Sequence, residues 1–296
     1  MTAAPQSATG GQDRSTLLWF NEMTDLTGVI DLHVHAGPDV RPRKLDAVAL
    51  ARAAKAAGMR ALLLKSHHTI TADLAQIVEG VVSGIRVCGS VTLNEAVGGL
   101  NPEAVQAAIA LGAKEIFMPT HSAANQRRHD GKTGGITILD NAGHVRDEVK
   151  RILDLIAHAD VILGTCHLSP DEILALVRVA RRAGVRRVLV THPELDSVAI
   201  PLTLQKAMAA EGAFFERMHL HGNSSTDLPG LAAITRAVGI ERTVLVTDLG
   251  AAKYDLDPVQ GMREFLQQMA DQGFSQAEID LMARWTPARL LGLDSW

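Results

Sequence analysis

The sequence predicts an α/β protein, a single (β/α)8 barrel of the TIM-barrel kind. Short β-branched apolar runs alternate with Ala- and Leu-rich helical stretches eight times along the chain, which is typical of a parallel sheet that closes on itself. Of the 296 residues, 47% are hydrophobic and only 3% aromatic, so the core is expected to consist of aliphatic side chains.

The elements follow from local patterns. Helical stretches often end in a glycine just before the next strand, as at Gly58, and Pro follows a capping side chain at Asn101, Ser169 and Asp257. Strands are expected at 29–36, 61–66, 86–92, 115–119, 161–165, 187–191, 213–219 and 243–247.

One interval, 120–160, is longer than the others and follows the fourth strand. Its segment 135–143 predicts a small hairpin on a long βα loop, which either shapes a substrate pocket or is a solvated excursion. Residues 1–28 are interpreted as a polar N-terminal tail and lead-in, and 29–296 as the barrel.

Composition argues against several classes of partner. The 29 Lys and Arg against 33 Asp and Glu give a formal net charge of −4, and no basic stripe with interleaved aromatics points to nucleic acid. No apolar stretch approaches the roughly 20 residues that span a bilayer, and the first residues lack the features of a signal peptide, so a cytoplasmic protein is expected. A homo-oligomer is one option for the assembly.

Cysteine usage gives no disulfide framework. Cys88 and Cys166 fall on different expected strands. Because strand residues alternate, Cys166 is expected to turn toward the helices as a packed thiol if His167 faces the barrel axis.

Metal-competent side chains stand at the ends of four apolar runs. Side chains two apart on a strand project to the same side, so the two histidines of VIDLHVHAG can bind one cation together. The carboxyl ends of barrel strands converge, and imidazole and carboxylate suit zinc and similar divalent metals. The full set of candidate ligands is His33, His35, His167, His192 and Asp248.

The order of these ligands along the strands resembles that of the amidohydrolase superfamily of metal-dependent hydrolases. The segment ARWTPARLLGLD is similar to the closing Asn-Pro-Ala-Arg-Leu-Leu-Gly segment of that superfamily, with Thr286 in place of Asn. The resemblance implies that His33, His35 and Asp248 hold a catalytic metal and that Asp248 shuttles a proton. It also implies that His167 and His192 bind a second metal or the substrate.

The chain departs from the superfamily at the fourth strand, which ends EIFMPTHSA without the usual carboxylated Lys or Glu. Lys65, in ALLLKSHHT at the end of the second strand, is the nearest substitute. An amine in an apolar run must be paired, modified or neutral, so this lysine is expected to have a specific partner or modification. We consider a carboxylated Lys65 that bridges two metals, an ammonium that binds substrate, and an ion pair with Glu216.

Further polar residues are candidate substrate contacts. His67 and His68 point opposite ways on a strand, so only one of them is expected to serve. Glu216 lies in an apolar run and is expected to meet a cation. The other candidates are His121, Asn94, Arg127 and Arg128, whereas His144, His158, His219 and His221 are interpreted as structural.

The expected function is hydrolysis of an amide, lactam, lactone or related ester by metal-activated water. The substrate is expected to be small, and carboxylated substrates are included. The catalytic groups would be Asp248, His192 and Lys65, and the cofactor one or two divalent ions, Zn²⁺ first, with Mn²⁺ or Fe²⁺ as alternatives. Two rivals are a mononuclear decarboxylase or hydratase and a phosphoesterase of the polymerase and histidinol phosphatase type. A metal-holding binding protein without catalysis is a further alternative.

Overall fold

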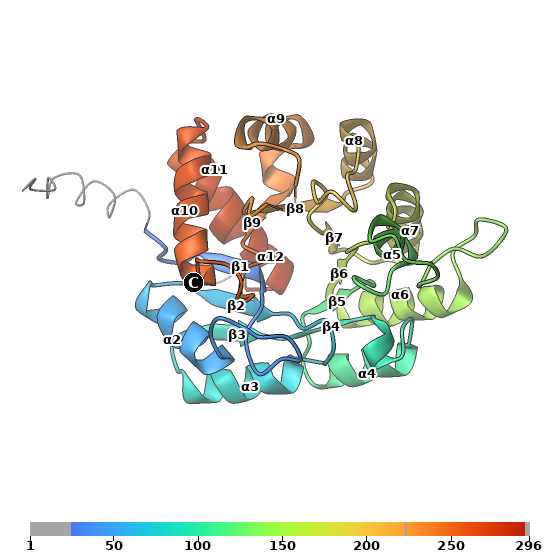
Figure 1. The fold of residues 1–296 in the computed structure, drawn as a ribbon, viewed down its shortest axis with the longest axis horizontal. Coiled ribbons are helices and arrows are strands. Elements are labelled where there is room, and N and C mark those ends of the chain that lie inside the picture. The colour runs from blue at the N-terminus through green and yellow to red at the C-terminus, as the bar shows by residue number, and fades with distance from the viewer. Residues whose placement is uncertain (1–24, 223, 294–296) are drawn as a thin grey trace, which may run out of the picture.

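The centre of the molecule is a ring of parallel strands surrounded by helices (Figure 1). The computed structural model describes residues 25–222 and 224–293. Every described strand falls within a range that the sequence predicts. The strands are β1 (Ile30–Val34), β2 (Ala61–Leu64), β3 (Arg86–Cys88), β4 (Ser90–Thr92), β5 (Glu115–Phe117), β6 (Ile162–Gly164), β7 (Val188–Val190), β8 (Phe214–Met218) and β9 (Thr243–Val246).

The strands pair in parallel in chain order, β1 to β3 and β4 to β9. Gly89 divides β3 from β4, and these two halves form one barrel strand. A Cβ on Gly89 would lie 2.4 Å from the carbonyl oxygen of Thr71, so only glycine lets the loop before α3 approach so closely. The last strand meets the first: Asp248 N donates to His33 O, and His35 N donates to Leu249 O, both at 2.9 Å. Eight strand positions therefore close into the predicted barrel.

Helices follow the strands and cover the outside of the ring (Figure 1). The expected caps are confirmed, since Asn101, Ser169 and Asp257 each accept hydrogen bonds from the first turn of a helix. The α-helices are α2 (Ala47–Ala56), α3 (Ala72–Val81), α4 (Pro102–Ala110), α5 (Ala124–His129), α6 (Asp147–Ala159), α7 (Pro170–Arg182), α8 (Leu202–Ala210), α9 (Leu228–Val238), α10 (Pro258–Asp271), α11 (Gln276–Asp280) and α12 (Thr286–Leu291). The 3-10 turns η1 (Glu95–Val97) and η2 (Ile240–Arg242) and the π-turn η3 (Leu281–Trp285) complete the set.

The long interval after the fourth barrel strand differs from the prediction. It carries the short helix α5, and the expected hairpin is reduced to one antiparallel bridge between Leu139 and Val145 around a turn. Asp140 holds this turn, because its side chain accepts from the backbone of Ala142 and His144 at 2.9 and 2.8 Å. The side chain takes the place of the cross-strand hydrogen bonds that a hairpin would need.

The core is aliphatic, as the composition predicts, with Phe117 and Phe215 as its larger buried members. Among the described residues, no helix is both long and apolar enough to cross a membrane.

Candidate metal centre

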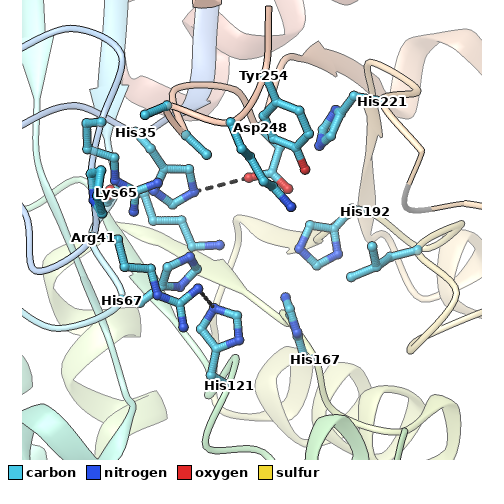
Figure 2. A pocket seen from close by; sticks show the side chains of 16 residues that line it. His35, Arg41, Lys65, His67, His121, His167, His192, His221, Asp248 and Tyr254 are labelled. Atoms are coloured by element: carbon cyan, nitrogen blue, oxygen red, sulfur yellow. Dashed lines mark hydrogen bonds and ion pairs between the residues drawn. The ribbon is translucent and has the colours of Figure 1, made fainter. Parts of the chain in front are cut away.

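A cavity of about 590 Å³ opens at the carboxyl ends of the strands, and ten of its residues are labelled in Figure 2. Six histidine rings at this end follow one another in a closed circle. The centroid distances are 5.5 Å for His33–His35, 4.8 Å for His35–His67, 4.4 Å for His67–His121, 5.9 Å for His121–His167, 4.9 Å for His167–His192 and 5.7 Å for His192–His33. Loops remote in sequence thus bring imidazoles from five barrel strands to one place.

His33, His35 and Asp248 form the tightest group in this circle. One ligand atom from each lies within 4.8 Å of the others. Asp248 Oδ1 lies 3.0 Å from His33 Nε2 and 3.1 Å from His35 Nε2, and the second of these contacts is drawn in Figure 2. Two imidazole nitrogens facing one carboxylate oxygen are a donor set that suits zinc and similar divalent cations.

The hydrogen bonds of His35 test whether a cation fits. Its Nδ1 lies 2.9 Å from Lys65 O, and its Nε2 faces Asp248, so both ring nitrogens meet acceptors. Burial lowers the pKa of His35 to about 4, which makes the ring neutral near pH 7 with a single N–H. One N–H cannot serve two acceptors. A cation between Nε2 and Asp248 resolves the conflict, so the three residues fit a metal ion.

His33 is held from behind by Glu216 on β8. Glu216 Oε2 accepts from His33 Nδ1 at 3.1 Å and from His192 N at 3.3 Å, and both side chains are fully buried. Burial lowers the pKa of His33, but the carboxylates of Asp248 and Glu216 outweigh it and raise the value to about 9. Although burial raises the pKa of Asp248, His33 and His35 hold it well below the usual range. Asp248 is therefore an anion at neutral pH.

Lys65 extends from the end of β2 into the barrel and lines the cavity. Its Nζ lies 3.0 Å from His33 Nε2, 3.7 Å from Cys166 Sγ and 4.2 Å from the centre of the Phe117 ring. Glu216 contacts His33, and no ion pair joins it to Lys65 among the described residues, so the ion-pair alternative for Lys65 is wrong. The imidazole of His33 on β1, and not the amine of Lys65, is the hydrogen-bond partner of the Glu216 carboxylate.

The loops after β2 and β5 are tied together by Asn94. Its amide donates to Thr120 Oγ1 at 2.7 Å and to His67 O at 3.0 Å, and its carbonyl oxygen accepts from Thr120 N at 2.9 Å. Asn94 is buried, and these contacts use its polar atoms internally. Thr120 Oγ1 also lies 3.0 Å from His67 Nδ1, so the network fixes the imidazole that lines the cavity.

The ends of β6, β7 and β9 carry backbone strain. Cys166, His192 and Asp248 have φ values of 51°, 32° and 51°, in the left-handed region that side chains other than glycine rarely adopt. The left-handed Cys166 breaks the strand alternation, so its thiol approaches Lys65 inside the barrel, and its expected place toward the helices is wrong. His167 follows, and its Nδ1 lies 2.5 Å from Gln126 Oε1, which leaves Nε2 for the cavity.

Other predicted residues lie away from this centre. His68 lies 3.4 Å from Asp39 and does not line the cavity, whereas His67 does. Arg127 forms an ion pair with Glu95 at 2.7 Å, and Arg128 is exposed. Neither arginine lines the cavity.

The structure adds residues that the sequence reasoning missed. Arg41, Lys253 and Tyr254 line the cavity, and His221, interpreted as structural, lies against Tyr254 with a centroid distance of 4.5 Å. The segment PDVRPRK, two residues after His-x-His, was the available signal for Arg41, since loops after barrel strands surround the active end. Glu115, buried on β5, was also missed, because it lies at the start of its strand and not at the end.

These features define an α/β barrel with a His-His-Asp centre at the carboxyl ends of its strands. Residues 28–216, more than half of the chain, match the family of unknown function DUF6282, and the chain belongs to that family. No curated protein matches the chain.

Solved structures share the fold. An amidohydrolase from Pseudomonas aeruginosa is 10% identical with a TM-score of 0.66, over 92% of this chain and 98% of that one. An organophosphorus hydrolase from Deinococcus radiodurans is 16% identical with a TM-score of 0.60, over 91% and 94%. A 2,6-dihydroxybenzoate decarboxylase from Rhizobium is 12% identical with a TM-score of 0.55, over 91% and 100%. At these identities the likeness confirms the barrel fold that the sequence resemblance implied.

Proposed function

We propose that the protein is a metal-dependent hydrolase that cleaves an amide, lactam, lactone or related ester of a small substrate. The observation that carries the proposal is the position of His35 between two acceptors, Lys65 O and Asp248 Oδ1, which a cation would reconcile. His33, His35 and Asp248 would hold that cation, and Zn²⁺ suits the donor set best. When bound, a divalent metal activates water near neutral pH and polarises a carbonyl oxygen.

The residues of the chain provide the proton transfers and the orientation. Asp248 is anionic at neutral pH and lies at the cavity, so it can accept a proton from the attacking water and return it to the leaving group. His167 and His192 line the same cavity on the side of β6 and β7 and can orient the substrate. His192 Nδ1 is buried without a hydrogen-bond partner in the described part of the chain, and an unsatisfied buried atom of this kind is one that a bound ion or water would account for.

We assign Lys65 the substrate-binding role rather than that of a carboxylated lysine that bridges two metals. Its neighbours are an imidazole nitrogen, a thiol and the face of Phe117, and the π face attracts a cation. A carboxylated lysine would place negative charge against the same ring, which is unfavourable. The ammonium can stabilise negative charge that develops on the substrate oxygen.

A mononuclear decarboxylase or hydratase is the second candidate. The fourth barrel strand ends in Pro119 and Thr120, where neither residue can bridge two metals, and the described residues bring together one His-His-Asp group. The Rhizobium decarboxylase shows that this fold accommodates decarboxylation in another protein. The phosphoesterase alternative is less well supported, because eight strand positions close the barrel, one more than that group has.

The test combines metal analysis with turnover. His35→Ala should abolish both bound metal and activity, whereas Asp248→Asn should keep part of the metal and lose turnover. His68→Ala is the matched control, since His68 faces Asp39 outside the cavity. Lactones, amides and esters are assayed for hydrolysis and aromatic carboxylic acids for CO2 release. Full activity in Asp248→Asn would contradict the proton-transfer role, and CO2 release alone would favour the second candidate.

A further inference from the structure

The cavity wall carries more positive than negative charge. Among the described residues that line it, Asp248 is the single carboxylate, and the cations are Arg41, Arg43, Lys65 and Lys253. Arg43 is neutralised, because its Nε donates to Asp39 Oδ2 at 2.7 Å. Within the described residues, Arg41 and Lys253 have no carboxylate at ion-pair distance, and Lys253 Nζ lies 4.8 Å from the centre of the Tyr254 ring. Two cations at the mouth therefore lack a counter-ion from the protein.

The contact between Arg41 and His121 shows how one of these cations is held. Arg41 Nη1 donates to His121 Nε2 at 3.0 Å, and this contact is drawn in Figure 2. A guanidinium group can only donate, so His121 Nε2 must be the acceptor and its ring is neutral. The imidazole fixes one end of the guanidinium without neutralising it. The edge formed by Nε and Nη2 stays available for an oxyanion with two oxygens.

The position of this pair relative to the metal centre suits a two-ended ligand. In Figure 2 Arg41, His67 and His121 lie on one side of the cavity, and Asp248 and Tyr254 lie on the other. Lys65 lies between the two sides. A substrate of modest size can therefore place one end at the arginine and the other at the metal candidates.

We propose that Arg41, held by His121, binds an oxyanion group of the substrate, a carboxylate or a phosphoryl group. The proposal rests on the proposed function for the reacting end, which lies at His33, His35 and Asp248. Arg41 takes the role that the sequence suggested for Arg127 and Arg128. The substrate is then an acidic compound whose charged group is separate from its amide, lactone or ester bond.

Ligand binding by the full-length chain tests this without requiring turnover. The probes are benzoate, phenyl phosphate and the neutral benzamide, titrated by calorimetry into metal-free and Zn²⁺-loaded protein. Arg41→Gln should weaken binding of the preferred anion at least about tenfold, the scale of one charge-assisted hydrogen bond. Arg128→Gln is the matched control, because Arg128 is an exposed arginine outside the cavity. Benzamide should be insensitive to both substitutions.

The two anionic probes distinguish a carboxylate from a phosphoryl group as the part of the substrate that Arg41 binds. A loss confined to benzoate assigns a carboxylate, and a loss confined to phenyl phosphate assigns a phosphoryl group. Equal affinity of Arg41→Gln and Arg128→Gln for both anions would overturn the proposal, as would failure of wild-type protein to bind either anion. Because metal-free protein is included, an Arg41-dependent anion site would still be detected if the protein bound no metal. Thermal melting of each variant confirms that it is folded.

Discussion

Glu216→Gln tests how the protein prepares His33 for a metal. Glu216 Oε2 lies 3.1 Å from His33 Nδ1 with both side chains fully buried, so the carboxylate orients the ring and directs Nε2 toward Asp248. The amide preserves shape but removes the charge. Loss of such an outer partner typically weakens metal affinity about 10- to 100-fold. That range corresponds to about 1.4 to 2.8 kcal/mol.

Glu115→Gln is the control for this substitution. Glu115 is also a buried glutamate inside the barrel, yet neither of its carboxylate oxygens has a hydrogen-bond partner in the described residues. Burial, together with the charge of Glu216, raises the pKa of Glu115 well above its usual range, which favours the protonated acid, a group that an amide resembles. Its substitution should leave metal affinity unchanged.

The assay is a competition titration of Zn²⁺ against a chromophoric chelator, at one pH, for wild type and both variants. Wild-type affinity in Glu216→Gln would refute the role of this carboxylate. Equal losses in the two variants would show that any change of buried charge in the barrel disturbs the site, and the specific contact with His33 would carry no weight.

Three further predictions address separate features. Intact mass under native conditions should show an unmodified Lys65, and a gain of one CO2 that is lost in Lys65→Met would contradict the ammonium assignment. Burial and the charge of Arg41 lower the pKa of His121 to about 4, so His121 is neutral at pH 7 and gains its proton only as the pH falls toward that value. Arg41→Gln should raise this pKa, and an unchanged His121 titration by NMR would contradict the contact. Gly89→Ala should lower the free energy of unfolding by about 1–3 kcal/mol, the usual cost of overpacking, and unchanged denaturant unfolding would contradict the close approach to Thr71.

The fold could be predicted from the sequence because it depends on local patterns. The alternation of apolar runs with helical stretches that end in glycine located every described strand. Asn101, Ser169 and Asp257 cap helices as expected. The short helix α5 was missed, since a six-residue helix inside a polar loop has too few apolar positions to show a period.

Contacts between strands were less predictable. Strand alternation failed at Cys166 because a left-handed backbone there turns the thiol inward. Lys65 and Glu216 were paired by charge alone, but His33 lies between them, with Nδ1 3.1 Å from Glu216 Oε2 and Nε2 3.0 Å from Lys65 Nζ. Arg41 was overlooked because its partner, His121, is eighty positions away in the chain and on another loop. Such pairings depend on side-chain directions that one sequence does not specify.

The location of a bound metal tests the central claim most directly. A crystal of the full chain grown with Zn²⁺ and measured on both sides of the zinc absorption edge would reveal the ion by anomalous scattering. A peak is expected between His33 Nε2, His35 Nε2 and Asp248 Oδ1. No peak in the barrel, or a peak that avoids these three side chains, would contradict it.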